Sequence, residues 1–82
     1  PKADVLADTL CDLARELTSH RRGGGPHWIA VSDIEAAMRR HGLDIDHDDL
    51  QAAISICVER HTMKAEGRPF HSIAPWQKEW KI

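Results

Sequence analysis

Aromatic residues are scarce in this 82-residue sequence, which contains no tyrosine, one phenylalanine and three tryptophans. Long hydrophobic runs are missing as well, because no stretch approaches the roughly 18 consecutive apolar residues that a membrane-spanning helix needs. The first residues do not combine the basic, apolar and small side chains of a secretory signal. We therefore expect a soluble, cytoplasmic protein with a single small hydrophobic core.

Cysteine is equally scarce. Cys11 and Cys57 lie far apart in the sequence and form no Cys-x-x-Cys pair, whereas the disulfide frameworks of small secreted proteins contain more cysteines. Cys57 and His61 are spaced to offer two ligands from one helical face, but a structural zinc site needs a second pair, and no second pair has ligand spacing. We expect two buried thiols, no metal site and no cofactor.

Recognisable catalytic motifs are also missing. The three glycines at 23–25 are followed by Pro26, without the Gly-Lys-Ser/Thr of a phosphate-binding loop. The aspartates of residues 44–49 resemble the start of a calcium loop, but the glycine and the closing glutamate of that loop are absent. No Ser/His/Asp or Cys/His/Asn arrangement stands out, so we predict that the protein is not an enzyme.

Charge is present in quantity but is distributed unevenly. Thirteen acidic residues against eleven lysines and arginines leave a net charge of −2. Residues 1–59 hold six basic and eleven acidic residues, a net charge of −5, whereas residues 60–82 hold five basic and two acidic residues, a net charge of +3. The sequence therefore predicts an acidic N-terminal part and a basic C-terminal part, the latter suited to phosphate contacts.

Hydrophobic periodicity predicts a first helix over residues 3–19 and a third helix over residues 47–60. In the first, leucines recur three or four residues apart and form one helical stripe. Asp46 or His47 opens the third, whose first turn is acidic, as the helix dipole favours. The leucines of the first stripe are Leu6, Leu10, Leu13 and Leu17.

Capping signals predict a second helix over residues 33–41. Ser32 and Glu35 form a capping box before it, and Gly42 provides the stop signal after it. Just ahead of the capping box, residues 28–31 contain β-branched and aromatic side chains and predict a short strand.

The remaining residues predict a connector, a hairpin and a tail. Residues 21–27 form a glycine-rich connector, because glycine and proline interrupt regular structure. Residues 62–74 alternate around a Gly-Arg-Pro turn and predict a hairpin that Pro75 closes. In the tail, residues 75–82, Trp76 and Trp80 are four residues apart and would share one face of a helical turn.

This order of elements, with local signals at residues 31–34 (Val-Ser-Asp-Ile) and 66–69 (Glu-Gly-Arg-Pro), resembles the winged helix-turn-helix superfamily over residues 3–75. The resemblance implies an α+β, mostly helical fold in one domain over residues 1–82, with the hairpin as the wing. It also implies a small DNA-binding protein, a transcriptional regulator or a DNA-associated accessory factor. We expect it to act as a homodimer, because two copies on one duplex bind more tightly than one.

Within that resemblance the third helix would supply base contacts and the wing phosphate contacts. The third helix is acidic where it would face DNA, at Asp48 and Asp49, and this opposes phosphate binding. We therefore expect the basic wing to carry most of the binding. The predicted nucleic-acid-binding residues are Arg39, Arg40, Gln51, Ser55, Lys64 and Arg68.

Winged helices also serve in protein docking, so the sequence leaves a second hypothesis open. In that hypothesis the acidic third helix docks a basic or nucleic-acid-handling partner. Trp76 and Trp80 would be apolar anchors for that partner or for a second copy of the chain. Alternatively, the two tryptophans pack back onto the first helix and enlarge a thin core.

Overall fold

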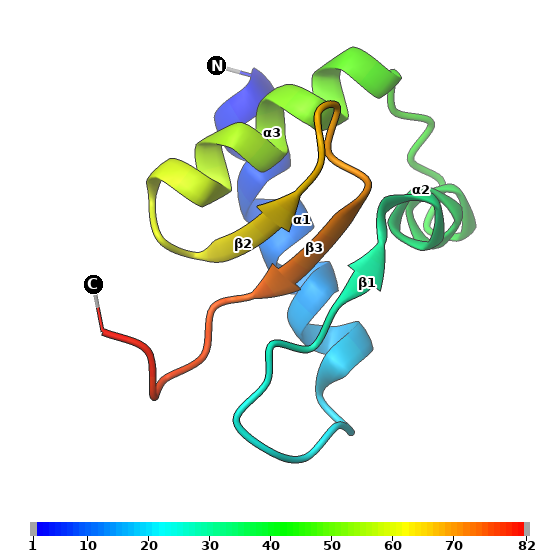
Figure 1. Cartoon of the computed structure of the whole chain (residues 1–82). Helices are drawn as coiled ribbons and strands as arrows, with labels where there is room; N and C mark the ends of the chain where they lie inside the picture. The colour runs from blue at the N-terminus through cyan, green and yellow to red at the C-terminus, as the bar shows by residue number, and fades with distance from the viewer. Residues whose placement is uncertain (1, 82) are drawn as a thin grey trace.

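Three helices and three short strands make up residues 2–81, the part of the chain that the computed structural model describes (Figure 1). The predicted domain also includes Pro1 and Ile82, which lie outside the described residues. The predicted α+β, mostly helical fold class is confirmed. The elements are α1 (Lys2–Thr18), β1 (Ile29–Ala30), α2 (Val31–Arg40), α3 (His47–Glu59), β2 (Met63–Glu66) and β3 (Ser72–Pro75).

Helix α1 buries the leucine stripe from which it was predicted. Leu10 is fully buried, Leu6 and Leu13 are nearly so, and Leu17 packs half-buried at the edge of the core. The buried face of α1 lies against α3, which contributes Leu50, Ala53, Ile54 and Cys57 to the same cluster. Removing these side chains from water is the main favourable contribution to folding, so the α1–α3 contact forms the centre of the core.

Helix α2 begins earlier than predicted and without the capping box. Its N-cap residue is Ala30, no side chain caps it, and Ser32 lies inside the first turn. The backbone provides the reason, because the Val31 N–H donates to the carbonyl of His71 at 2.9 Å and the chain turns directly from the sheet into the helix. The stop at Gly42 is confirmed, since Gly42 has φ +78° and the Leu43 N–H donates to Met38 O at 2.8 Å.

Helix α3 starts where the sequence placed it. Asp46 is the N-cap residue, and its carboxylate accepts a hydrogen bond from the Asp48 N–H at 3.1 Å. The helix ends at Glu59, one residue short of the prediction, and Arg60 is its C-cap. His61 follows with φ +57°, the left-handed conformation that turns the chain into β2.

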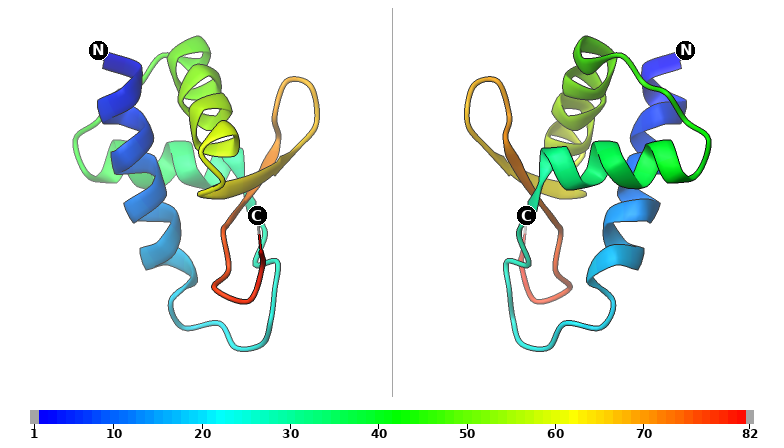
Figure 2. Two further views of the ribbon diagram at one scale, coloured as in Figure 1. Left: turned by 90° about the vertical axis from the view of Figure 1, so that its left-hand side faces the viewer. Right: turned by 90° about the vertical axis from the view of Figure 1, so that its right-hand side faces the viewer.

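The strands form one antiparallel sheet in the order β1-β3-β2. Ile73, in the central strand β3, pairs with Ile29 of β1 on one side and with Ala65 of β2 on the other. Three helices with this sheet and its β2–β3 hairpin are compatible with a winged-helix-like topology. In Figure 2 the hairpin forms a loop beside α3.

Two details of the strands differ from the prediction. Strand β1 has two residues instead of the four predicted at 28–31, because only Ile29 and Ala30 pair with β3. Pro75 was expected to close the hairpin from outside, but it is the last residue of β3, opposite Met63. Proline has no N–H to donate, so its place at the end of the ladder agrees with its chemistry.

The connector and the C-terminal tail lie side by side at the end of the molecule opposite the wing tip (Figure 2). Gly25 touches Gln77 so closely that a Cβ on Gly25 would lie 2.5 Å from the Gln77 side-chain nitrogen. The guanidinium of Arg21 donates to the carbonyl of Trp28 at 2.8 Å and closes the connector from the other side. Within residues 2–81, no helix is both long enough and apolar enough to cross a membrane.

Candidate nucleic-acid interface

A pair of reciprocal hydrogen bonds joins the wing to α3. The Gln51 carboxamide nitrogen donates to the carbonyl of Phe70 at 2.8 Å, and the Phe70 N–H donates to the Gln51 carboxamide oxygen at 2.8 Å. We call this pair the wing latch. Because one planar amide satisfies both backbone groups of Phe70, it fixes the position and the orientation of the wing tip relative to α3.

The turn of the wing has a defined shape of its own. Gly67 has φ +96°, and a Cβ on it would lie 2.3 Å from the imidazole ring of His71. Glycine is therefore required at this position for conformation and for space. The His71 N–H donates to Glu66 O at 2.9 Å, which closes the turn and leaves Arg68 exposed at its tip.

A hollow of about 280 Å³ lies where the wing tip meets the starts of α2 and α3. The sequence places His47 at the start of the third helix, but no local pattern relates it to Phe70 or His71. Their proximity depends on the wing folding back onto the helices, a long-range contact. The residues that line the hollow are Val31, Ser32, Glu35, His47, Pro69, Phe70 and His71.

The outward face of α3 next to the wing is small and polar at its centre and acidic at both ends. Ala52 and Ser55 are exposed in its middle, Asp48 is exposed near its start and Glu59 at its last turn. Asp49 is different, because its carboxylate pairs with Lys2 of α1 at 3.0 Å. One of the two acids predicted to repel phosphate is therefore turned toward α1 and partly neutralised.

The roles of the two predicted base-reading residues on α3 now differ. Ser55 remains exposed, whereas both polar ends of the Gln51 carboxamide are bonded to the wing. A DNA contact by Gln51 stays a prediction, and it would require breaking the wing latch. Gln51 therefore holds the wing against α3, a role that its place in the helical pattern did not suggest.

Lys64 of the wing belongs to a cluster of aromatic rings. Its ammonium lies 4.0 Å from the centroid of the Trp80 ring and 6.0 Å from that of Trp76. Trp76 in turn packs edge-on against Trp80, with centroids 5.1 Å apart, and against His61, at 5.5 Å. We call His61, Lys64, Trp76 and Trp80 the tail cluster. Edge-to-face rings and a cation over a ring attract each other, so the cluster fastens the tail to β2.

The backbone of the tail supports this cluster. The Trp76 N–H donates to Thr62 O at 3.0 Å, and the Trp80 N–H donates to Gln77 O at 3.1 Å in a turn. The indole N–H of Trp76 donates to Trp80 O at 3.3 Å. The two indole rings meet edge-on although the tail is not helical, and both tryptophans are half-buried within the tail cluster.

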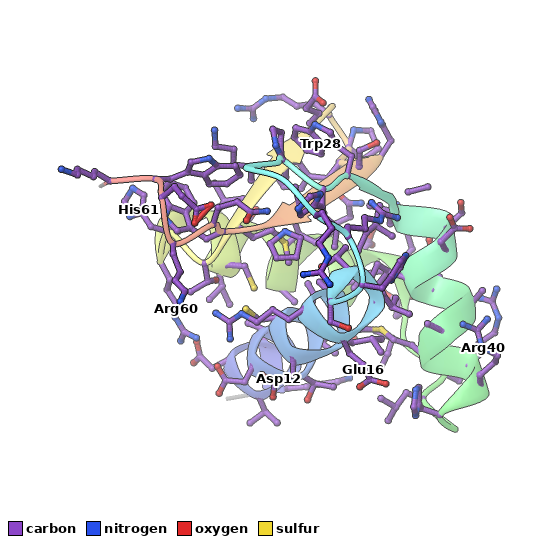
Figure 3. All side chains as sticks on the ribbon, turned by 90° about the horizontal axis from the view of Figure 1, so that it is seen from below. Asp12, Glu16, Trp28, Arg40, Arg60 and His61 are labelled. Atoms are coloured by element: carbon purple, nitrogen blue, oxygen red, sulfur yellow. The ribbon has the colours of Figure 1, made fainter. Side chains whose placement is uncertain are left out.

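Arg60 belongs to the basic C-terminal part of the sequence, but its charge lies against the acidic helix α1. Its guanidinium lies 2.8 Å from the Asp4 carboxylate and 3.4 Å from that of Asp8, both on α1. In Figure 3, Arg60 lies beside His61 on the side of the molecule opposite Arg40. If Arg60 is counted with the helices, the net charge of the N-terminal part changes from −5 to −4 and that of the C-terminal part from +3 to +2.

The structure does not bring Arg39 and Arg40 together with the wing. Helix α2 starts beside the wing and runs away from it, so these two residues lie at its far end (Figure 2). Arg40 instead borders a hollow of about 230 Å³ shared with Arg21 and Asp33. The predicted basic residues therefore fall into two groups, Lys64 and Arg68 on the wing and Arg39 and Arg40 at the end of α2.

Comparisons of the chain with protein-family models, with curated proteins and with solved structures found no match.

Both cysteines are buried free thiols, as predicted. The Cys57 thiol lies 3.4 Å from Ala7 O, and burial raises the pKa of that thiol. The His61 ring packs edge-on against Trp76. Within residues 2–81, no three His, Cys, Asp or Glu side chains are grouped so that they could hold a metal ion.

Proposed function

We propose that the chain is a member of the winged helix-turn-helix superfamily that binds duplex DNA, mainly through phosphate contacts from its wing. The observation that carries this proposal is the wing latch. It joins the wing tip and α3 into one surface with Arg68 at its edge and the small residues Ala52 and Ser55 beside it. A preorganised surface binds with less loss of conformational entropy than a free hairpin.

The charges on this surface favour backbone contacts over base reading. Arg68 offers its guanidinium to phosphates at the wing tip. Lys64 would add a second cation by exchanging its contact with the Trp80 ring for a phosphate, and each neutralised phosphate releases counterions. Asp48 and Glu59 flank the centre of α3 and oppose close approach of the helix to the same phosphates. The proposed binding is therefore strongly salt-dependent and weakly sequence-dependent, as expected of a DNA-associated accessory factor or of a regulator that acts as a homodimer.

The experiment is a fluorescence-anisotropy titration of a labelled duplex over a series of salt concentrations. We expect Lys64→Glu/Arg68→Glu to weaken binding by at least about tenfold at low salt, with a slope of log affinity against log salt smaller by about one unit for each lost phosphate contact. The matched control is Arg21→Glu/Arg22→Glu, which makes the same change in charge in the connector. Absence of duplex binding by the wild-type chain at low salt, or an equal loss in the control, would contradict the proposal.

The acidic ends of α3 provide a second arm of the same experiment. If α3 faces the duplex, Asp48→Asn/Glu59→Gln removes two repulsive charges and raises the affinity by about three- to tenfold at low salt. Asp12→Asn/Glu16→Gln makes the same change in net charge on α1 and serves as its control. An increase confined to the α3 variant supports contact at α3, whereas equal increases would assign the effect to net charge alone.

A further inference from the structure

A groove runs along α1 beside the loop between α2 and α3, and at Asp12 it adjoins a further hollow that Arg15 and Arg60 border. It consists of two hollows, of about 370 and 250 Å³, that share Thr9 of α1 and Leu43 of the loop between α2 and α3. From Lys2 to Glu16 it follows α1 for about 21 Å, at about 1.5 Å per residue. The residues that line it are Lys2, Val5, Leu6, Thr9, Asp12, Leu13, Glu16, His41, Leu43 and Ile45.

The floor and walls of the groove are apolar. Leu6 and Leu13 form part of the core beneath it, and Ile45 is half-buried in its wall. Val5 is 66% exposed and Leu43 is 36% exposed, and these two are the exposed large hydrophobic residues of the described chain. They lie in the same hollow although they are far apart in the sequence, so the exposure is concentrated at one place.

The rim of the groove is acidic at one end. Asp12 and Glu16 line the second hollow one helical turn apart, and within residues 2–81 neither forms an ion pair. Figure 3 shows both side chains on the outer side of α1. At the other end of the groove, Lys2 is engaged with Asp49 at 3.0 Å. An apolar strip with carboxylates that form no ion pair along one end is complementary to an amphipathic segment that carries lysine or arginine.

We infer that this groove is a docking surface for a basic amphipathic helix of a partner protein. A helix laid along a groove of this length places apolar side chains at three- and four-residue intervals, and these would contact Val5, Leu43 and Ile45. Its basic residues would face Asp12 and Glu16. The α3 face lacks exposed large hydrophobic residues, so the docking surface of the interaction hypothesis lies along α1 instead of α3.

A second copy of the chain fits the groove less well than such a partner. Packing two copies of this face together would bring Asp12 and Glu16 of both copies into one interface, and the basic residue of the groove, Lys2, already pairs with Asp49. The exposed apolar surface is also limited to Val5 and Leu43, whereas stable dimers usually bury about 1,200 Å² or more.

The test uses a labelled synthetic helix that has leucines three and four residues apart and lysines on its remaining positions. Binding to the full chain is measured by fluorescence anisotropy, with a matched peptide in which glutamate replaces lysine. We expect Val5→Ser/Leu43→Ser and Asp12→Asn/Glu16→Gln each to weaken binding by about tenfold. The control Asp33→Asn/Glu79→Gln removes two exposed acids outside the groove and should leave the affinity within about twofold of wild type.

Three outcomes would overturn the inference. One is an equal loss of affinity in the control variant, which would indicate general attraction between opposite charges. Another is unchanged binding by Val5→Ser/Leu43→Ser. The third is a wild-type dimer in sedimentation equilibrium that this variant dissociates, which would assign the groove to a second copy. The Val5/Leu43 variant should retain the duplex affinity of wild type, so this inference and the proposed function fail independently.

Discussion

The packed helices and the wing-and-tail segment (residues 60–81) are held by different kinds of interaction. Between α1 and α3 the contact is mainly apolar, with Leu10, Leu50 and Ile54 fully buried and the Lys2–Asp49 ion pair at its edge. The wing and tail contribute a small share of the core and depend on the wing latch and the tail cluster. Apolar burial is non-directional, whereas hydrogen bonds and ring contacts fix orientation. The helices therefore provide most of the stability, and a few polar contacts determine where the wing points.

The two surfaces that we propose for binding also belong to these two different regions. In our two proposals, Arg68 and Lys64 of the wing contact phosphate, and the apolar groove along α1 with Asp12 and Glu16 binds a basic segment. They lie on different parts of the fold, so one chain has room for both ligands at once.

The largest effect is expected where the sheet joins the core. Ile73 is fully buried in the central strand, and Ile73→Ala should lower the free energy of unfolding by about 2–4 kcal/mol because it leaves a cavity. Val5→Ala shortens a comparable aliphatic side chain at an exposed site and should change the free energy of unfolding by less than about 0.5 kcal/mol. Urea unfolding followed by circular dichroism measures both. Similar losses in the two variants would mean that burial does not determine stability here.

An intermediate effect is expected at the wing latch. Gln51→Ala leaves the backbone groups of Phe70 without their partners and should lower the free energy of unfolding by about 1–3 kcal/mol. Hydrogen exchange of the Phe70 amide should accelerate more than that of amides in α1. Ser55→Ala, on the exposed face of the same helix, is the control. If exchange at Phe70 is unchanged in Gln51→Ala, the latch does not hold the wing.

The smallest effect is expected at Arg60. Its ion pairs with Asp4 and Asp8 are exposed, and such pairs contribute little, so Arg60→Ala should cost less than about 1 kcal/mol of unfolding free energy. Because these pairs hold the charge at α1, duplex affinity should stay within about twofold of wild type. Arg68→Ala, measured beside it in the anisotropy titration, should show the larger loss. Equal losses would place Arg60 in the DNA interface with the wing.

Local signals predicted the helices and the hairpin well. The leucine stripe of α1, the N-cap Asp46 and the stop at Gly42 each depend on residues near one another in the chain, so periodicity and capping rules describe them. The capping box at Ser32 failed because a distant carbonyl, that of His71, accepts the Val31 N–H. The candidate site was predicted only in part for the same reason. The sequence identified Arg68 as a wing residue but did not predict that Gln51 of α3 holds the wing.

The sequence by itself determined the fold class, the number and order of the helices and the excess of positive charge in the C-terminal part. These properties depend on composition and on short-range periodicity, and neither of these depends on how the elements pack together. Only the tertiary structure decided that Gln51 fastens the wing, that Arg60 acts with α1, and that Val5 meets Leu43 in one groove. Each of these is a contact between residues far apart in sequence. Such contacts arise from the packing of whole elements, and no local pattern encodes them.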